Sequence, residues 1–139
     1  YSSDRTVRSL QNRLVNKLML GTLKFDAESV EENMLHNFVL FQQAGVPVLM
    51  GADAGNPSVI PGYSAHRELE YMVAGGMTIA DVLRSATIDP ARFLGVGDTM
   101  GSIAEGKVAS FLMLDRNPLE NIRNSQSIHR VMLEGFWIE

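Results

Sequence analysis

Apolar residues recur at helical spacing between residues 27 and 45. Val30, Met34 and Phe38 lie four positions apart, and this period predicts a helix with one apolar face. Asp26 is placed to cap the start of that helix, and Gly45 is placed to end it. The pattern therefore predicts a long amphipathic helix that packs against something on one side only.

Shorter helices are predicted on either side of this one. Leucines at four-residue spacing predict a short helix over residues 10–18. Downstream, Ser64 is placed to cap a further helix, and Thr78 with Asp81 forms a capping-box pattern ahead of another. Pro90 is expected at the first position of a last helix, because a proline there loses no helical hydrogen bond.

Residues 46–50, Val-Pro-Val-Leu-Met, form a short apolar run without alternation. Such a run is typical of a strand that is covered on both faces in a parallel sheet. Pro47 is tolerated near the start of a strand. We therefore expect a buried strand here, between the long helix and the helix that Ser64 would cap.

After Gly95 the pattern changes from helical spacing to short apolar runs separated by turn residues. Glu134-Gly135 lies between two of these runs and predicts a hairpin. The expected strands are residues 111–114, 128–133 and 136–138. The fold class is therefore α/β, with an α/β segment over residues 1–99 and closing β-structure over residues 100–139.

Composition and charge exclude several classes of protein. Of the 139 residues, 45% are hydrophobic and 20% charged, which is ordinary for a globular domain. The net charge of −4 gives no support for a nucleic-acid partner, and the lack of cysteine excludes disulfides and thiolate metal sites. No apolar run is long enough for a membrane span, and no signal-peptide pattern is present. We expect a soluble, cytoplasmic protein.

One carboxylate stands directly after the predicted buried strand. Asp53 follows residues 46–50 at their carboxyl end, where parallel α/β folds place their functional groups. A carboxylate there can bind a divalent metal or act as general base toward a metal-bound water. The alternative is that Asp53 is a turn residue in Asp-Ala-Gly that bonds its own backbone. The pattern alone leaves both open.

His66 lies near the start of the following helix and could face the same pocket as Asp53, as an outer-shell donor or a substrate contact. The alternative is an exposed helix histidine. Arg67 could hold a substrate carboxylate, although a solvated arginine is the simpler interpretation. Glu68 and Glu70 are interpreted as ordinary helix acids.

Several motifs occur in a fixed order along the chain. They are Gly-x-Asp at 51–53, His-Arg-Glu-Leu-Glu at 66–70, Ala-Thr-x-x-Pro-Ala-Arg at 86–92, Gly-Ser-Ile-x-x-Gly-Lys at 101–107 and Leu-Asp-x-Asn-Pro-Leu-Glu at 114–120. This ordered set resembles the C-terminal part of the amidohydrolase superfamily, closest to its imidazolonepropionase-like and prolidase-like branches.

The resemblance implies the C-terminal part of a TIM-type (β/α) barrel followed by short strands of a small β-sandwich domain. It implies a hydrolase that cleaves a C–N amide bond, linear or cyclic, with a divalent metal such as zinc. Asp53 matches the family's aspartate after the last barrel strand, a metal ligand and proton shuttle. His66 matches a histidine near the substrate or in an outer shell. Ser110 stands where many members have aspartate, so we expect a different bonding of that turn.

The family's other metal ligands have no counterpart in this sequence, and a whole barrel takes about 250 residues. The resemblance therefore implies a C-terminal fragment that is inactive alone and whose partners are the missing N-terminal barrel portion and a small-molecule amide substrate. The alternative is a non-catalytic α/β interaction or assembly module without a functional metal site. The exposed barrel edges of such a module would be apolar and would favour oligomers, and we expect a homo-oligomer.

Overall fold

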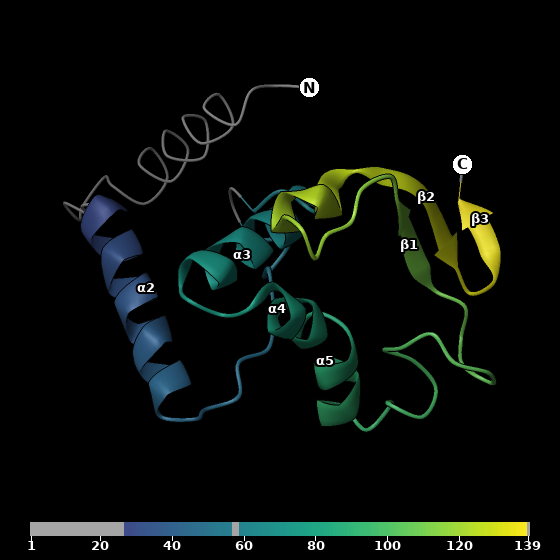
Figure 1. Ribbon diagram of the computed structural model, residues 1–139, viewed down its shortest axis with the longest axis horizontal. Coiled ribbons are helices and arrows are strands. Elements are labelled where there is room, and N and C mark those ends of the chain that lie inside the picture. Colours follow the sequence, from purple (N-terminus) through teal and green to yellow (C-terminus); the bar gives the residue numbers. More distant parts are fainter. Residues whose placement is uncertain (1–26, 57–58, 139) are drawn as a thin grey trace.

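The computed structural model describes residues 27–56 and 59–138. The helix predicted over residues 10–18 and the cap predicted at Asp26 lie outside the described residues. Figure 1 shows α2 at one side, the three strands at the opposite side and the shorter helices between them. The elements, in chain order, are α2 (Ala27–Gln43), α3 (Tyr63–Ala74), α4 (Ile79–Ser85), α5 (Ile88–Phe93), β1 (Phe111–Leu114), the 3₁₀ helix η1 (Ile122–Gln126), β2 (Ile128–Leu133) and β3 (Phe136–Ile138).

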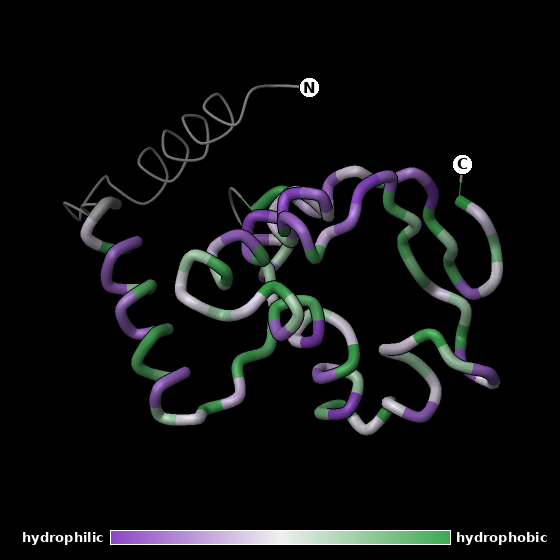
Figure 2. The backbone as a smooth tube through the Cα atoms, in the orientation of Figure 1, coloured by the Kyte–Doolittle hydropathy of each residue, from purple (hydrophilic) through white to green (hydrophobic). Residues whose placement is uncertain are grey.

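The long helix α2 forms and ends as its sequence predicts. Gly45 takes a left-handed backbone with φ of 71°. Its N–H donates to the carbonyl of Gln42, and the N–H of Val46 donates to the carbonyl of Phe41, both at 2.9 Å. This pair of bonds is a Schellman motif, which satisfies the last free carbonyls of the helix. Green and purple segments alternate along α2 in Figure 2, as expected of an amphipathic helix.

The core lies where α3, α4 and η1 meet. Its buried members are Leu69, Met72, Val82 and Ile122. Leu69 and Met72 are three positions apart on α3, so one face of that helix supplies both. This packing brings η1, which begins 48 residues after the end of α3, against α3 and α4.

The helix starts agree with the sequence in one case and differ in two. The hydroxyl of Thr78 accepts the N–H of Asp81 at 3.2 Å, which confirms the predicted cap of α4. Helix α3 begins one residue before Ser64, whose hydroxyl donates to the carbonyl of Ile60 instead. Pro90 is the third residue of α5, not the first, and still costs no hydrogen bond because the first N–H groups of a helix have no partner within it.

A close contact with Gly75 attaches α2 to the rest of the fold. The side-chain amide of Gln42 donates to the Gly75 carbonyl at 2.8 Å. A methyl group on Gly75 would lie 2.7 Å from Phe38 Cε1 and closer still to Cδ1. The backbone conformation of Gly75, with φ of −77°, is open to any residue. Glycine is therefore favoured here by the lack of space beside Phe38 and not by its backbone freedom.

Residues 46–50 do not form the predicted strand in this structure. Among the described residues no strand pairs with this segment. The N–H of Met50 donates instead to the carbonyl of Ser85 at 3.0 Å, which ties the segment to the end of α4. A strand needs a neighbouring strand to satisfy its N–H and C=O groups, and the described residues supply none at this place.

The three strands predicted near the end of the chain are confirmed. They form one antiparallel sheet in the order β1-β2-β3, with Glu134 and Gly135 turning at positive φ, 51° and 87°, as the favoured hairpin turns require. The ring of Phe111 lies edge-on to Trp137 with centroids 6.1 Å apart. Ser110, for which the resemblance implied a different bonding of the turn, accepts the Glu134 N–H at 2.9 Å and so joins β1 to the hairpin turn.

Candidate active site

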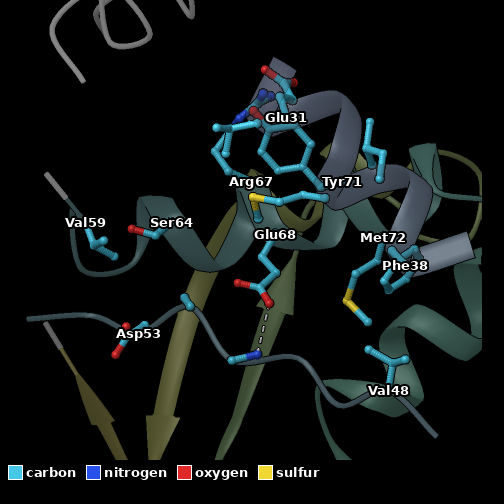
Figure 3. A pocket seen from close by; sticks show the side chains of 15 residues that line it. Glu31, Phe38, Val48, Asp53, Val59, Ser64, Arg67, Glu68, Tyr71 and Met72 are labelled. Carbon is cyan, nitrogen blue, oxygen red and sulfur yellow. Dashed lines mark hydrogen bonds between the residues drawn. The ribbon is translucent and has the colours of Figure 1, made fainter. Parts of the chain in front are cut away.

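A cavity of about 590 Å³ lies between α2, the segment 48–53 and α3. Its lining is mainly apolar, with residues such as Met34, Phe38 and Met72. Four charged side chains also reach it, those of Glu31, Asp53, Arg67 and Glu68. Figure 3 shows these groups around the opening, with α3 along one wall and the segment that carries Asp53 along another.

Asp53 lies at the rim of this cavity, after residues 46–50 and before α3. It is exposed and has a left-handed backbone, with φ of 49°. Its carbonyl accepts the N–H of Asn56 at 3.4 Å, and its carboxylate accepts a hydrogen bond from the Asn56 side-chain amide. Asp53 is therefore a turn residue, and its carboxylate is also held, oriented and open to solvent beside a cavity. The carboxylate binds the side chain of Asn56 and not its own backbone, and the role of Asp53 as metal ligand or base stays a prediction.

Glu68 connects α3 to the segment that leads into Asp53. One carboxylate oxygen of Glu68 accepts the N–H of Gly51 at 3.2 Å (Figure 3). Partial burial raises the pKa of Glu68 because it penalises the charged form, and the bond from Gly51 acts in the opposite direction. The interpretation of Glu68 as an ordinary helix acid is incomplete, since Glu68 also lines the cavity and accepts a backbone N–H from a residue 17 positions away.

Arg67 is buried, so the interpretation of a solvated arginine is also wrong. Its guanidinium lies 2.6 Å from a carboxylate oxygen of Glu70 and 5.0 Å from the centroid of the Tyr71 ring. Stacking on an aromatic face suits the planar guanidinium. Arg67 thus places a compensated positive charge in the wall of the cavity.

His66 is not among the residues that line the cavity. Its Nδ1 lies 2.9 Å from the hydroxyl of Ser125 on η1. Partial burial lowers the pKa of His66, and the nearby carboxylate of Glu70 opposes that shift. In this structure His66 joins α3 to η1 and does not share the pocket of Asp53. A role near the substrate stays a prediction.

The cavity-facing residues of α3 share a spacing that the sequence displays. Residues 64, 67, 68, 71 and 72 line the cavity, at intervals of three and four that define one face of a helix. His66 and Glu70, four positions apart, lie on a different face and contact η1. Extending this stripe from Ser64 would have pointed to Arg67 and Glu68 rather than to His66.

The described residues form no metal site by themselves. Among them, no group of three or more histidine, cysteine, aspartate or glutamate side chains could hold a metal ion. Asp53 offers one accessible carboxylate, whereas a catalytic zinc takes three protein ligands. Within the same described residues, no helix is long and apolar enough to cross a membrane.

The chain resembles parts of several solved structures, and three of them are described as a dipeptidase, a putative prolidase and a hydrolase. The chain is similar to a Xaa-Pro dipeptidase with bound methionine in its active site, with a TM-score of 0.74 and 27% identity, over 96% of this chain and 33% of that one. It is similar to a putative prolidase from Bifidobacterium longum, with a TM-score of 0.66 and 33% identity, over 76% and 26%. It is similar to molinate hydrolase, with a TM-score of 0.67 and 29% identity, over 75% and 26%.

The chain thus spans a third or less of the length of these similar structures. The comparison confirms the predicted fold class, an α/β chain that matches the C-terminal part of a TIM-type barrel and its small β-domain. No curated protein matches the chain at a significant level. The model of the Amidohydrolase family matches residues 9–138, nearly the whole sequence, and the chain therefore belongs to the amidohydrolase family, in its prolidase-like branch.

Proposed function

We propose that this chain is the C-terminal portion of a metal-dependent enzyme that hydrolyses a C–N amide bond. The observation that carries the proposal is the place of Asp53. Its exposed carboxylate is oriented by Asn56 at the rim of a cavity, directly after the segment 46–50. In this position a carboxylate can accept a proton from an attacking water and return it to the leaving nitrogen.

The similar structures favour a peptide-like substrate within this class. One is a Xaa-Pro dipeptidase and another a putative prolidase. The mainly apolar cavity with a few charged groups suits a small molecule that carries both apolar and polar parts. We therefore propose a small linear amide such as a dipeptide, with a small cyclic amide as the alternative.

The proposed cofactor is a divalent metal, zinc in the first instance. A bound zinc would supply a Lewis acid and lower the pKa of a coordinated water. Asp53 fits such an ion as a single carboxylate ligand, and the remaining ligands would come from outside the described residues. The side chain of Asn56 would keep the carboxylate of Asp53 in one orientation.

The metal content of the purified chain distinguishes between a metal site that is shared with other barrel segments and a metal site that this chain forms alone. We expect the chain alone to bind no stoichiometric zinc and to hydrolyse no amide, because Asp53 is one ligand of a set. Stoichiometric zinc in the isolated chain would contradict the proposal that the site is shared with other barrel segments.

The activity itself can be tested in a chimera. This chain would replace the matched third of the Xaa-Pro dipeptidase, whose remaining two thirds supply the other barrel segments. With zinc added, we expect hydrolysis of dipeptides or of small cyclic amides. A folded, zinc-loaded chimera that cleaves neither class, while the parent dipeptidase does cleave its own substrates, would overturn the proposal.

A second candidate function is that of a non-catalytic assembly module. Exposed apolar side chains are the observation that supports it. Phe93, Ile103 and Phe136 are 79%, 86% and 76% exposed in the chain. We propose that these groups meet another protein, either the rest of a barrel or a second copy of the chain, because buried apolar area favours such contacts. Sedimentation equilibrium over a range of concentrations tests the second copy, for which we expect a dimer or larger homo-oligomer.

A further inference from the structure

The hydrogen bond between Glu68 and Gly51 crosses from a helix to the segment that carries the proposed acid. Gly51 lies two positions before Asp53, and Glu68 lies in the second turn of α3. The bond measures 3.2 Å from the Gly51 nitrogen to the Glu68 carboxylate. Figure 3 shows the side chain of Glu68 extending from α3 to the backbone of this segment.

Packing does not hold Gly51 in place. A methyl group built on Gly51 would meet nothing within 4 Å, so the backbone has open space on that side. The preceding N–H, that of Met50, is bonded to Ser85 on α4 at 3.0 Å. Among the bonds between described residues, the one from the Gly51 N–H to Glu68 is the last before Asp53 that ties the backbone to another element.

The backbone at Asp53 needs such a fixed point. A left-handed φ of 49° is uncommon for a residue other than glycine, although aspartate adopts it more readily than most, and contacts on both sides of the residue help to keep it. Asn56 holds Asp53 from the downstream side through its side-chain amide. Glu68 holds the segment that enters this turn, through the N–H of Gly51 two positions upstream of Asp53. The two bonds thus restrain the backbone on both sides of Asp53.

We propose that Glu68 is a positioning residue for Asp53, which it fixes by binding the N–H of Gly51. This inference rests on the proposed role of Asp53 as the acid and base of amide hydrolysis. Glu68 is no catalytic residue in this account, because it acts on the backbone and not on the substrate. A glutamine at position 68 keeps an acceptor oxygen at the same reach, whereas alanine removes it.

The first test needs no activity and uses the chain itself. Nuclear magnetic resonance would measure the rate of solvent exchange at the amides of Gly51 and Met50. In Glu68→Ala we expect the Gly51 amide to exchange roughly fivefold faster or more, while Glu68→Gln keeps most of the protection. Glu105→Ala, at an exposed turn, serves as the control and leaves both rates unchanged. Equal increases at Gly51 and Met50, or no increase at Gly51, would overturn the inference.

The second test uses the zinc-loaded chimera with the dipeptidase. Glu68→Ala should lower kcat by about tenfold or more and change KM by less than about twofold, because a displaced base affects the transition state more than substrate binding. Glu68→Gln should restore most of kcat. If Asp53→Asn abolishes turnover and Glu68→Ala does not change it, the inference about Glu68 fails alone. If Asp53→Asn keeps full turnover, the proposed function fails, and the exchange data still decide whether Glu68 fixes Gly51.

Discussion

The imidazole of His66 on α3 and the hydroxyl of Ser125 on η1 lie 2.9 Å apart, although 59 residues separate them in the chain. Ser125 is buried, and His66 is half-buried. The same two elements are joined by the amide of Gln126, which donates to Glu70 at 3.0 Å. These polar bonds fix the helix that lines the cavity to the segment that leads into β2.

This contact predicts a pH-dependent stability. Burial lowers the pKa of His66 below its ordinary value of 6.5, so the folded chain binds fewer protons at this site than the unfolded chain. The stability that the neutral ring contributes is therefore complete above pH 6.5 and falls as the pH drops through 6.5 toward the lowered pKa. Urea unfolding of the wild type and of His66→Gln, at several pH values between 8 and 5, measures the contribution of His66 to the free energy of unfolding. We expect the difference in unfolding free energy to change with pH in that window, and parallel curves would contradict the assignment.

Gly75→Ala tests the attachment of α2. The new methyl group would meet the ring of Phe38 at 2.7 Å or less, and overpacking of this kind costs about 1–3 kcal/mol. Gly51→Ala is the matched control because its methyl group would meet nothing within 4 Å. In a Phe38→Ala background the cost of Gly75→Ala should shrink, as a double-mutant cycle would show. An equal cost in both backgrounds would mean that Phe38 is not the obstacle.

Glu70→Ala tests the polar network on the buried side of α3. Glu70 and Arg67 are paired at 2.6 Å with side chains only 12% and 9% exposed, and breaking a buried pair costs about 3 kcal/mol or more. Asp89→Ala is the control, because its pairs with Arg84 and Arg92 are 3.5 Å and 3.8 Å long and both arginines are more than half exposed. We expect that control to cost less than about 1 kcal/mol. Similar losses in thermal or urea unfolding for both variants would contradict this ranking.

Asp53→Gly separates the function of Asp53 from its contribution to the fold. Glycine accepts the φ of 49° without strain, which offsets the lost bond to Asn56. We expect the free energy of unfolding to change by less than about 1 kcal/mol, with hydrolysis by the chimera abolished. Glu134→Gly, at the other non-glycine residue with positive φ among those described, should leave hydrolysis intact. A loss of stability above about 2 kcal/mol would show that the carboxylate of Asp53 mainly supports the fold.

Features set by neighbouring residues could be predicted from the sequence. The stop at Gly45, the cap at Thr78 and the turn at Glu134-Gly135 each depend on residues within about one helical turn or one hairpin. Local backbone chemistry is enough to place such features. For the same reason, the three short strands near the end of the chain were predicted at their observed bounds.

Features set by distant residues could not be predicted in this way. The residues at 46–50 have the composition of a strand, but a strand also needs a neighbour, which the described residues do not supply. The bond from Gly51 to Glu68 and the contact of His66 with Ser125 depend on how α3 is rotated about its axis. That rotation is set by the packing of α3 against Val82 and Ile122 in the core. The spacing of charged residues along the sequence does not predict this packing.

The most direct test of the central claim is the turnover of the zinc-loaded chimera that carries Asp53→Asn. Asparagine keeps the size of the side chain and an acceptor for the amide of Asn56, but it cannot take a proton. Asp98→Asn, at another exposed aspartate, is the control. We predict that Asp53→Asn lowers kcat for amide hydrolysis by about 100-fold or more, while the control keeps normal turnover. Full turnover by the folded Asp53→Asn chimera would contradict the account.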